Sequence, residues 1–311
     1  MAITAAMVKE LREMTGAGMM DCKKALNETN GNMDEAVEYL RKNGQAKAEK
    51  KASRIAAEGL CKVLVDGDKT AAVVEVNSET DFVAKNEEFQ KFVTAVAKQA
   101  LATSSADIDA FLAENWNEDA SKTVKEALVE KVAVIGENLS IRRFEKVVAD
   151  NGCVVTYTHG GGRIGVIVEA DTAVVNDAVK EALTNVAMQI AALNPKYVST
   201  DEVSEEYKEH EKAILMEQIK NDPKMAGKPD KVIEGAVNGR LAKELKEVCL
   251  LEQVYVKAED GKQTVKAYID SVAKANNAEV TVKKFVRFET GEGLEKKSED
   301  FAAEVAAQIN G

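Results

Sequence analysis

The chain has 311 residues, of which 45% are hydrophobic and 31% are charged, and it contains only 3 prolines. This length and composition predict a soluble globular protein of two or three domains, each large enough to bury a core. The formal net charge of −11 argues against nucleic acid as the main partner. Since no stretch is apolar over the ~18 residues that a spanning helix needs, we expect no membrane segment.

The N-terminus, the cysteines and the histidines indicate the compartment. The opening stretch MAITAAMVKELREMTG meets charge by Lys9 and lacks the apolar segment of a secretory signal. The four cysteines lie far apart and form no CxxC pair: Cys22, Cys61, Cys153 and Cys249. Neither His159 nor His210 neighbours a cysteine, which argues against a zinc site. We therefore expect reduced, buried thiols in a cytoplasmic protein that holds no metal and no cofactor.

Residues 1–44 are predicted to form a bundle of three short helices. Thr4 can cap the first helix, which ends at Gly16, and the third is expected to end at Gly44. An alanine- and lysine-rich helix over residues 45–57 would link the bundle to the next domain. The inward-facing stripe of the bundle is expected to comprise Val8, Leu11, Met20, Leu26, Val37 and Leu40.

The link to the next domain is the basic part of an acidic chain. Residues 1–54 hold ten Lys or Arg against eight Asp or Glu, and four of the basic residues cluster near the end: Lys47, Lys50, Lys51 and Arg54. This run could contact RNA. A solvated helix face is the favoured interpretation, because Glu49 and several alanines dilute the charge.

A repeated pattern follows the link. Residues 59–76 read as strand, tight turn and strand, and a helix over residues 86–102 comes next. Residues 152–170 repeat the hairpin pattern with a glycine-rich turn, and a helix over residues 176–192 comes after it. Closing strands are expected over two further segments, residues 139–149 and 279–289.

The repeat predicts an α+β fold with two similar subdomains, each a small antiparallel sheet with helices on one face. The first subdomain would span residues 55–148. The second would comprise residues 149–196 and 250–290, because an insertion interrupts it. A glycine turn and a short helix would form a C-terminal module over residues 291–311.

The insertion, residues 197–249, is predicted to be an antiparallel helical hairpin. Pro223 and Pro229 lie in its middle, where the chain would turn. Two helical stripes of apolar residues would pack together: Val203, Tyr207, Ile214 and Ile219 in the first helix, and Ile233, Val237, Leu241, Leu245 and Val248 in the second.

Two glycine patterns resemble nucleotide-binding loops, but their context is wrong. Gly160, Gly162 and Gly165 satisfy GxGxxG, yet a strand rather than a helix is expected after them, which indicates a hairpin turn. The stretch TGAGMMD at residues 15–21 follows a helix rather than a strand. The sequence contains no GxxxxGK[ST] motif and no evident set of nucleophile, base and acid. We expect neither covalent catalysis nor direct nucleotide binding.

Phe82 is an aromatic residue in a connection that is otherwise polar. It lies between a strand that ends near Val76 and a helix that begins near Asn86. It could close the core where the strand meets the helix. Alternatively, the polar run from Asn77 to Asp81 stops the buried face from continuing, so that Phe82 is exposed as an anchor for another protein.

Five stretches closely resemble the family of bacterial translation elongation factor Ts. They are KELREMTGAGMMDCKKAL (9–26), VEVNSETDFVAKNEEF (74–89), IGENLSIRR (135–143), HGGGRIGVIV (159–168) and RFETGEGLEKKSEDFAAEV (287–305). The stretches occur in the family's order and cover essentially the whole chain. The resemblance implies the same α+β layout, with residues 1–54 forming a UBA-like helical domain and a basic linker.

The resemblance implies a guanine-nucleotide exchange factor for elongation factor Tu, which speeds GDP release without covalent chemistry. One segment would displace magnesium and disturb the partner's phosphate-binding loop: Thr80, Asp81, Phe82 and Val83. Ile135 and Gly136 would support that contact. The helical domain would dock on the partner's nucleotide-binding domain through Arg12, Met19 and Met20, and the second subdomain, including His159, would contact another domain of the partner. The factor would stabilise the nucleotide-free partner until GTP binds.

Two other classes of function stay open. Residues 1–44 could belong to an adaptor that binds ubiquitin-like or other peptide partners through Met19 and Met20, although these could equally be core residues. Alternatively, the cleft between the two subdomains could hold an enzyme site of an unrecognised kind. Release of GDP from elongation factor Tu would separate exchange activity from the adaptor, and a search for a tight small-molecule ligand would test the enzyme.

Overall fold

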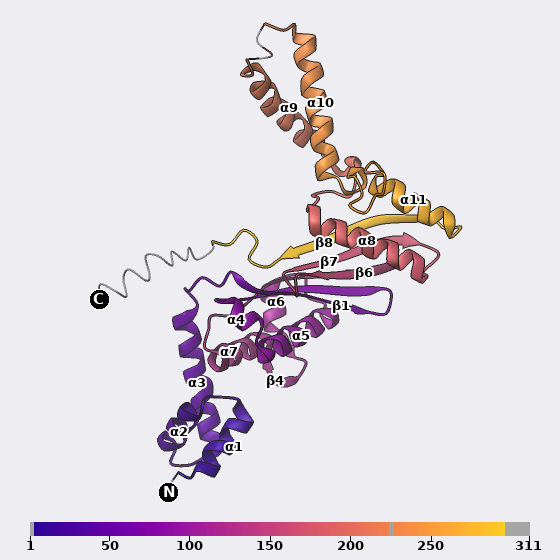
Figure 1. Cartoon of the computed structure of the whole chain (residues 1–311). Helices are drawn as coiled ribbons and strands as arrows, with labels where there is room; N and C mark the ends of the chain where they lie inside the picture. The colour runs from indigo at the N-terminus through magenta and orange to yellow at the C-terminus, as the bar shows by residue number, and fades with distance from the viewer. Residues whose placement is uncertain (1–2, 224, 226, 296–311) are drawn as a thin grey trace.

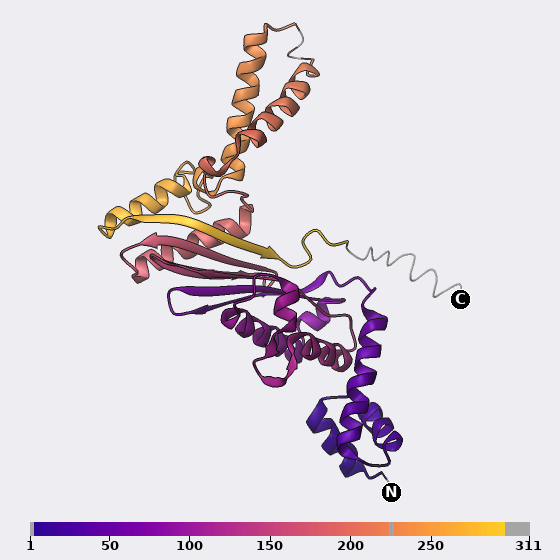
Figure 2. The same ribbon diagram turned by 180° about the vertical axis from the view of Figure 1, so that it is seen from behind.

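The protein is elongated, with helices at both ends and two sheets between them (Figures 1 and 2). The computed structural model describes residues 3–223, 225 and 227–295. The mixed α and β composition expected from the sequence is confirmed. The helix expected within the C-terminal module lies outside the described residues. In the part of the chain that the structure describes, no helix is long and apolar enough to cross a membrane.

The N-terminal bundle consists of α1 (Ala5–Thr15), α2 (Met19–Glu28) and α3 (Met33–Lys51). Thr4 caps α1 as expected, since its hydroxyl accepts a hydrogen bond from the Met7 N–H at 3.3 Å. Gly16 follows α1 in the left-handed conformation, with a φ of 67°. The buried residues of the bundle are Val8, Leu11, Cys22, Ala25, Leu26 and Ala36.

Met20 does not belong to the core of the bundle, contrary to the prediction. Its side chain is 76% exposed. Cys22, Ala25 and Leu26 share one face of α2 at helical spacing and fill the core, which leaves Met20 on the solvent side of the helix.

The third helix does not end at Gly44, as the sequence predicted, but runs on to Lys51. Gly44 is buried against α7 (Val124–Ile135), where an added Cβ atom would lie 3.4 Å from the Cβ atom of Ala133. A glycine inside a helix costs about 1 kcal/mol relative to alanine. Here it lies inside α3 at the contact with α7, so it does not mark a helix end.

The basic run fastens the linker to the rest of the chain. Lys47 pairs with Asp21 at 2.9 Å, and Arg54 lies 3.4 Å from the carboxylate of Glu79. The Lys51 ammonium donates to the carbonyl of Gly136, just beyond α7. The run is therefore more than the solvated helix face that the sequence suggested, because three of its four side chains make contacts within the chain.

Two three-stranded antiparallel sheets form the centre of the protein. The first has the order β1 (Glu58–Asp66), β2 (Thr70–Ser78) and β5 (Ser140–Val148). The second has the order β6 (Cys153–His159), β7 (Ile164–Thr172) and β8 (Val280–Glu289). Both predicted hairpins and both closing strands are confirmed. The GxGxxG pattern lies in the β6–β7 hairpin, as predicted.

The two sheets pack face to face, and helices cover their outer faces (Figure 1). On β2, Val74 and Val76 pack beneath α5 (Glu87–Ala102), whereas Val73 packs against the second sheet. Similarly, β7 turns Val166 and Val168 toward α8 (Asp177–Leu193) and Ile167 toward the first sheet. Both central strands are therefore buried on both faces, which explains their continuous apolar sequences.

Several shorter elements were not anticipated from the sequence. The first half also contains α4 (Asp81–Ala84), α6 (Ile108–Ala113), the β3 (Asn115–Trp116) and β4 (Asp119–Thr123) hairpin, and α7. The second half contains α11 (Val265–Ala275) and two 3₁₀ turns, Thr200–Glu202 and Leu250–Glu252. A complete capping box formed by Thr123 and Glu126 begins α7, so its start was readable from the sequence.

The inserted segment forms the expected antiparallel pair of helices, α9 (Glu205–Lys220) and α10 (Asp230–Val248). It projects from the end of the second sheet (Figures 1 and 2). The buried seam comprises Leu215, Ile219, Val237 and Leu241. The expected position of Ile214 is wrong, because its side chain is 39% exposed and Leu215 packs inward in its place.

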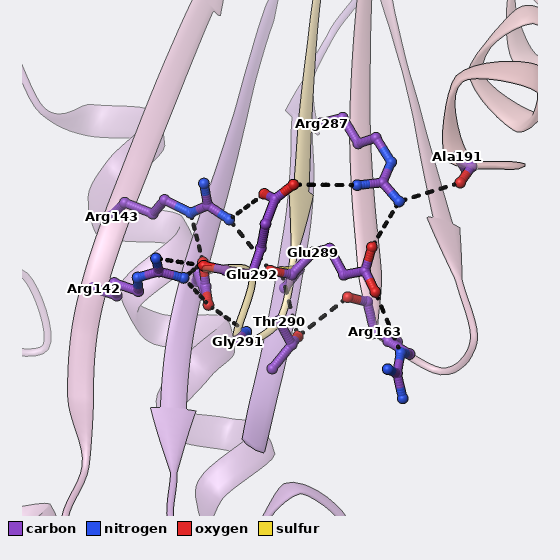
Figure 3. Close-up of polar contacts among 11 residues, drawn as sticks. Arg142, Arg143, Arg163, Ala191, Arg287, Glu289, Thr290, Gly291 and Glu292 are labelled. Atoms are coloured by element: carbon purple, nitrogen blue, oxygen red, sulfur yellow. Dashed lines mark hydrogen bonds and ion pairs between the residues drawn. The ribbon is translucent and has the colours of Figure 1, made fainter. Parts of the chain in front are cut away.

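A buried ionic junction fastens the two sheets together at one end (Figure 3). Glu75 on β2 is fully buried, and its carboxylate lies 3.0 Å from Arg142 and 2.5 Å from Arg143, both on β5. The same carboxylate accepts a hydrogen bond from the Gly291 N–H at 2.8 Å, just beyond β8. Arg143 also pairs with Glu292 at 3.1 Å. The segment that follows β8 is thus held against the first sheet.

The chemistry of this junction keeps Glu75 ionised. Burial alone would raise the pKa of Glu75, but hydrogen bonds from Gly291 and Asn77 and the charge of Arg143 outweigh it and lower the pKa below its ordinary value. Gly291 has a φ of 73°, and a Cβ atom there would lie 2.1 Å from the carbonyl oxygen of Ala57. Only glycine fits this position, because both the backbone conformation and the space exclude a side chain.

Candidate functional site

The turn formed by residues 80–83, the Phe82 turn, connects β2 to α5. Strand β2 continues through Asn77 and Ser78, which are both buried. The expectation that the polar run ends the buried face at Asn77 is therefore wrong, because the side chain of Asn77 donates to Glu75 and to the carbonyl of Glu58. Beyond the strand, the hydroxyl of Thr80 accepts from the Val83 N–H at 3.4 Å and caps the single helical turn α4.

Phe82 points into solvent from this turn. Its side chain is 79% exposed. Val83, by contrast, is partly buried and packs against the core beneath α5. The interpretation in which Phe82 closes the core is wrong, and its exposure is confirmed. Its contact with a partner stays a prediction.

Asp81 stands beside Phe82 as an exposed, ionised carboxylate. Lys85, one helical turn later, lies 2.6 Å from it, and this hydrogen bond lowers the pKa of Asp81 below its usual range. The ammonium of Lys85 also lies 5.9 Å from the centroid of the Phe82 ring. The turn thus presents an aromatic ring, an anion and a cation together.

Glu137 holds the base of the turn, and sequence reasoning missed it. Its carboxylate accepts hydrogen bonds from the N–H groups of Glu79 and Thr80, both at 3.0 Å, and from the Thr80 hydroxyl at 2.7 Å. In return, the carboxylate of Glu79 accepts from the Asn138 N–H at 2.6 Å. One signal was present in the sequence. An acidic residue directly after a helix C-terminus is unfavourable for the helix dipole, so it calls for a compensating partner.

Ile135 and Gly136 lie next to Glu137 and therefore beside the turn. Gly136 ends α7 in the left-handed conformation, with a φ of 87°, and is exposed. Ile135 is partly buried and packs against the core of the first half. The structure thus brings together two groups of predicted site residues that are about 50 positions apart in the sequence.

Arg12, Met19 and Met20 lie on the N-terminal bundle, at a distance from the Phe82 turn (Figure 1). Met19 and Met20 are 56% and 76% exposed at the start of α2, and Arg12 is exposed in the last turn of α1. Two adjacent exposed methionines form a flexible apolar surface. This position agrees with a docking role and rules out the alternative in which the methionine pair is core.

His159 ends β6 on the second sheet. It is exposed, and its Nδ1 atom lies 3.1 Å from the hydroxyl of Tyr157. The turn that follows touches the first sheet, since the carbonyl of Gly162 accepts from the Cys61 N–H at 2.7 Å. His159 lies on the second sheet, whereas the Phe82 turn follows a strand of the first sheet. We treat His159 as a third candidate contact.

The cysteine thiols and the potential metal ligands could form a second kind of site. All four cysteines are buried as expected, and burial raises the pKa of the Cys61 thiol to about 12. Among the described residues, no group of three or more His, Cys, Asp and Glu is placed to hold a metal ion.

Comparison with known proteins identifies the family. A family model described as Elongation factor TS matches residues 79–292. The chain is 56% identical to elongation factor Ts of Clostridioides difficile (strain 630) over 308 residues, which cover 99% of both chains. It is 50% identical over 308 residues to the protein of that name from Clostridium botulinum (strain Eklund 17B / Type B), with 99% of both covered. The protein of that name from Trichlorobacter lovleyi is 50% identical over 312 residues, with 99% of this chain and 98% of the relative covered. The chain therefore belongs to the elongation factor Ts family.

Proposed function

We propose that this protein is the guanine-nucleotide exchange factor for elongation factor Tu in translation elongation. The observation that carries the proposal is the exposure of Phe82, at 79%, on a turn whose base is fixed by Glu137. An exposed aromatic residue on a rigid scaffold is typical of an interface hot spot. The family membership of the chain supplies the identity of the partner.

The division of roles follows the three separate candidate contacts. The N-terminal bundle docks on the nucleotide-binding domain of the partner through Arg12, Met19 and Met20. The Phe82 turn then enters the partner near the bound nucleotide, displaces magnesium and disturbs the phosphate-binding loop. Ile135 and Gly136 support that entry from beside the turn. On the second sheet, His159 contacts another domain of the partner.

The energetics of exchange require no covalent step. Magnesium and backbone N–H groups hold the phosphates of a bound nucleotide, so removing them weakens binding of GDP. A factor that binds the emptied partner best must weaken nucleotide binding by the same coupling factor, because linkage is reciprocal. GTP then displaces the factor in turn. The protein acts in the cytoplasm as a binding protein and binds no nucleotide of its own.

The test is the release of fluorescent GDP from elongation factor Tu, measured with and without this protein. The expected result is a release rate that rises with the concentration of the factor and reaches a plateau. An unchanged rate at every concentration contradicts the proposal. In that case, the exposed methionine pair on α2 would favour the adaptor function, and binding of ubiquitin-like and peptide probes would be measured next.

A further inference from the structure

One carboxylate, that of Glu137, accepts three hydrogen bonds from the residues that lead into the Phe82 turn. The register of β2 with β1 ends at Ser78, and its register with β5 ends at Asn77. The next two N–H groups, those of Glu79 and Thr80, lie beyond both registers and donate to the same oxygen of Glu137. The Thr80 hydroxyl donates to the other oxygen. The carboxylate thus takes the place of a neighbouring strand for the last residues before Phe82.

Glu137 is itself fixed in place. The Gly136 N–H donates to the carbonyl of Val132 at 2.9 Å, so the end of α7 is closed directly before Glu137. Directly after it, the Asn138 N–H donates to Glu79, and the Asn138 side chain donates to the carbonyl of Arg54 at 2.7 Å. Two acidic side chains therefore hold each other's backbone segments, with the guanidinium of Arg54 beside Glu79 to offset their repulsion.

Phe82 depends on this anchor for its direction. Its ring is mostly in solvent, and the contact with Lys85 at 5.9 Å is weak. The path of the turn is set by the Glu137 contacts and a hydrogen bond from the Ser78 hydroxyl to the Thr80 carbonyl on its N-terminal side, and by the packing of Val83 on its C-terminal side. Without the Glu137 contacts, a single side-chain hydrogen bond to the Thr80 carbonyl holds the N-terminal side, so that the chain from Glu79 to Phe82 gains freedom, and ordering it on binding costs conformational entropy.

We propose that Glu137 is a positioning residue for nucleotide exchange, which acts through Phe82 by holding the Phe82 turn in the conformation that enters the partner. The inference rests on the proposed function. It concerns the rate of release within the complex rather than docking, because the docking residues Arg12, Met19 and Met20 lie on a different part of the chain.

The test compares Glu137→Ala with Phe82→Ala and with the double variant in the GDP-release assay. Glu137→Ala is expected to lower the plateau rate about tenfold, which corresponds to about 1.4 kcal/mol. The half-saturating concentration is expected to change less than about threefold, since docking is untouched. The double variant is expected to exchange no more slowly than Phe82→Ala alone, because Glu137 has nothing left to position. Glu118→Gln, an exposed glutamate between β3 and β4, is the matched control and is expected to match the unmodified protein.

A second pair of variants keeps the test decisive if Glu137→Ala folds poorly. Thr80→Val keeps the shape of the side chain but removes the hydroxyl, which both donates to Glu137 and caps α4 by accepting from the Val83 N–H. Thr80→Ser keeps both contacts. The valine variant is expected to lower the plateau rate by about threefold to tenfold, and the serine variant to stay within about twofold of the unmodified protein.

The outcomes separate the inference from the proposed function. If Phe82→Ala exchanges normally, the proposed function of the turn fails. If Phe82→Ala is slow but Glu137→Ala and Thr80→Val exchange normally, only the positioning role is overturned. Losses from Glu137→Ala and Phe82→Ala that add fully in the double variant also overturn it, because Glu137 would then act independently of Phe82.

Discussion

Replacing Phe82 with alanine tests the exposed ring directly. Full burial of a phenylalanine is worth roughly 1.5–3 kcal/mol. Because the side chain is 79% exposed, only about a fifth of that, roughly 0.3–0.6 kcal/mol, is available to the free protein. The melting temperature should therefore hardly change. In the proposed mechanism, this burial energy is gained in the complex mainly as the nucleotide contacts break, so its loss should slow GDP release by about 10- to 100-fold.

The assay is stopped-flow release of fluorescent GDP from elongation factor Tu at saturating factor, with thermal unfolding measured by circular dichroism. Phe89→Ala is the matched control, because Phe89 belongs to α5 and is fully buried in the core of the first half. It should cost about 3–5 kcal/mol of folding stability, while the fraction that stays folded exchanges normally. The reasoning is refuted if Phe82→Ala shows the pattern expected for Phe89→Ala, with a large loss of stability and near-normal exchange.

Three further predictions concern the rest of the chain. Glu75→Gln should lower the free energy of unfolding by about 3 kcal/mol at neutral pH, since it removes the negative charge from a buried ion pair. The loss is expected at the low end for a buried pair, because both arginines are partly exposed to solvent. Because the pKa of Glu75 lies below its ordinary value of 4.5, the unmodified protein should lose this stabilisation as pH falls below 4.5, and the variant should show a flatter pH profile in urea unfolding. Replacing residues 205–246 with a short Gly-Ser linker should leave a cooperative melting transition, because the helical hairpin has its own core; a broad, non-cooperative melt would contradict this. Removing residues 1–52 should weaken binding to elongation factor Tu in calorimetry and slow exchange at limiting concentration, with partial rescue at high concentration; unchanged affinity would rule out docking by the bundle.

Much of the fold was predictable because local patterns and tertiary packing agree. The apolar runs of β2 and β7, the glycine turns between the strands and the cap at Thr4 each correspond to an observed element. The failures have two causes. Met20 and Ile214 were assigned to the wrong face of their own helices. Gly44 reads as a helix end from its neighbours alone, yet α3 continues past it and packs there beside Ala133 of α7.

The candidate site was predictable only in part. The sequence analysis left two readings of Phe82 open, and the structure decides for exposure, although Asn77 and Ser78 of the polar run before it are buried. The exposure of Met20 was not predicted, because the helical spacing of the bundle placed it in the core stripe. Glu137 could not be assigned a role either. Its function depends on three donors from a segment almost 60 residues earlier, and a lone glutamate after a helix has many ordinary explanations. The closeness of Ile135 and Gly136 to the turn was not predictable for the same reason, since it depends on contacts between segments far apart in the sequence.

Because α3 is one continuous helix, its length sets the orientation of the N-terminal bundle relative to the rest of the protein. Each residue of an α-helix adds about 1.5 Å and about 100° of rotation. A single residue inserted ahead of Gly44, where the helix meets α7, would therefore swing the exposed methionines of the bundle through more than a quarter of a circle relative to the Phe82 turn. Four inserted residues would nearly restore the direction and add only about 6 Å of reach. An insertion or deletion in this helix is thus limited more by the rotation that it causes than by the distance that it adds. The number of residues between the bundle and α7 therefore determines which way the exposed methionines face.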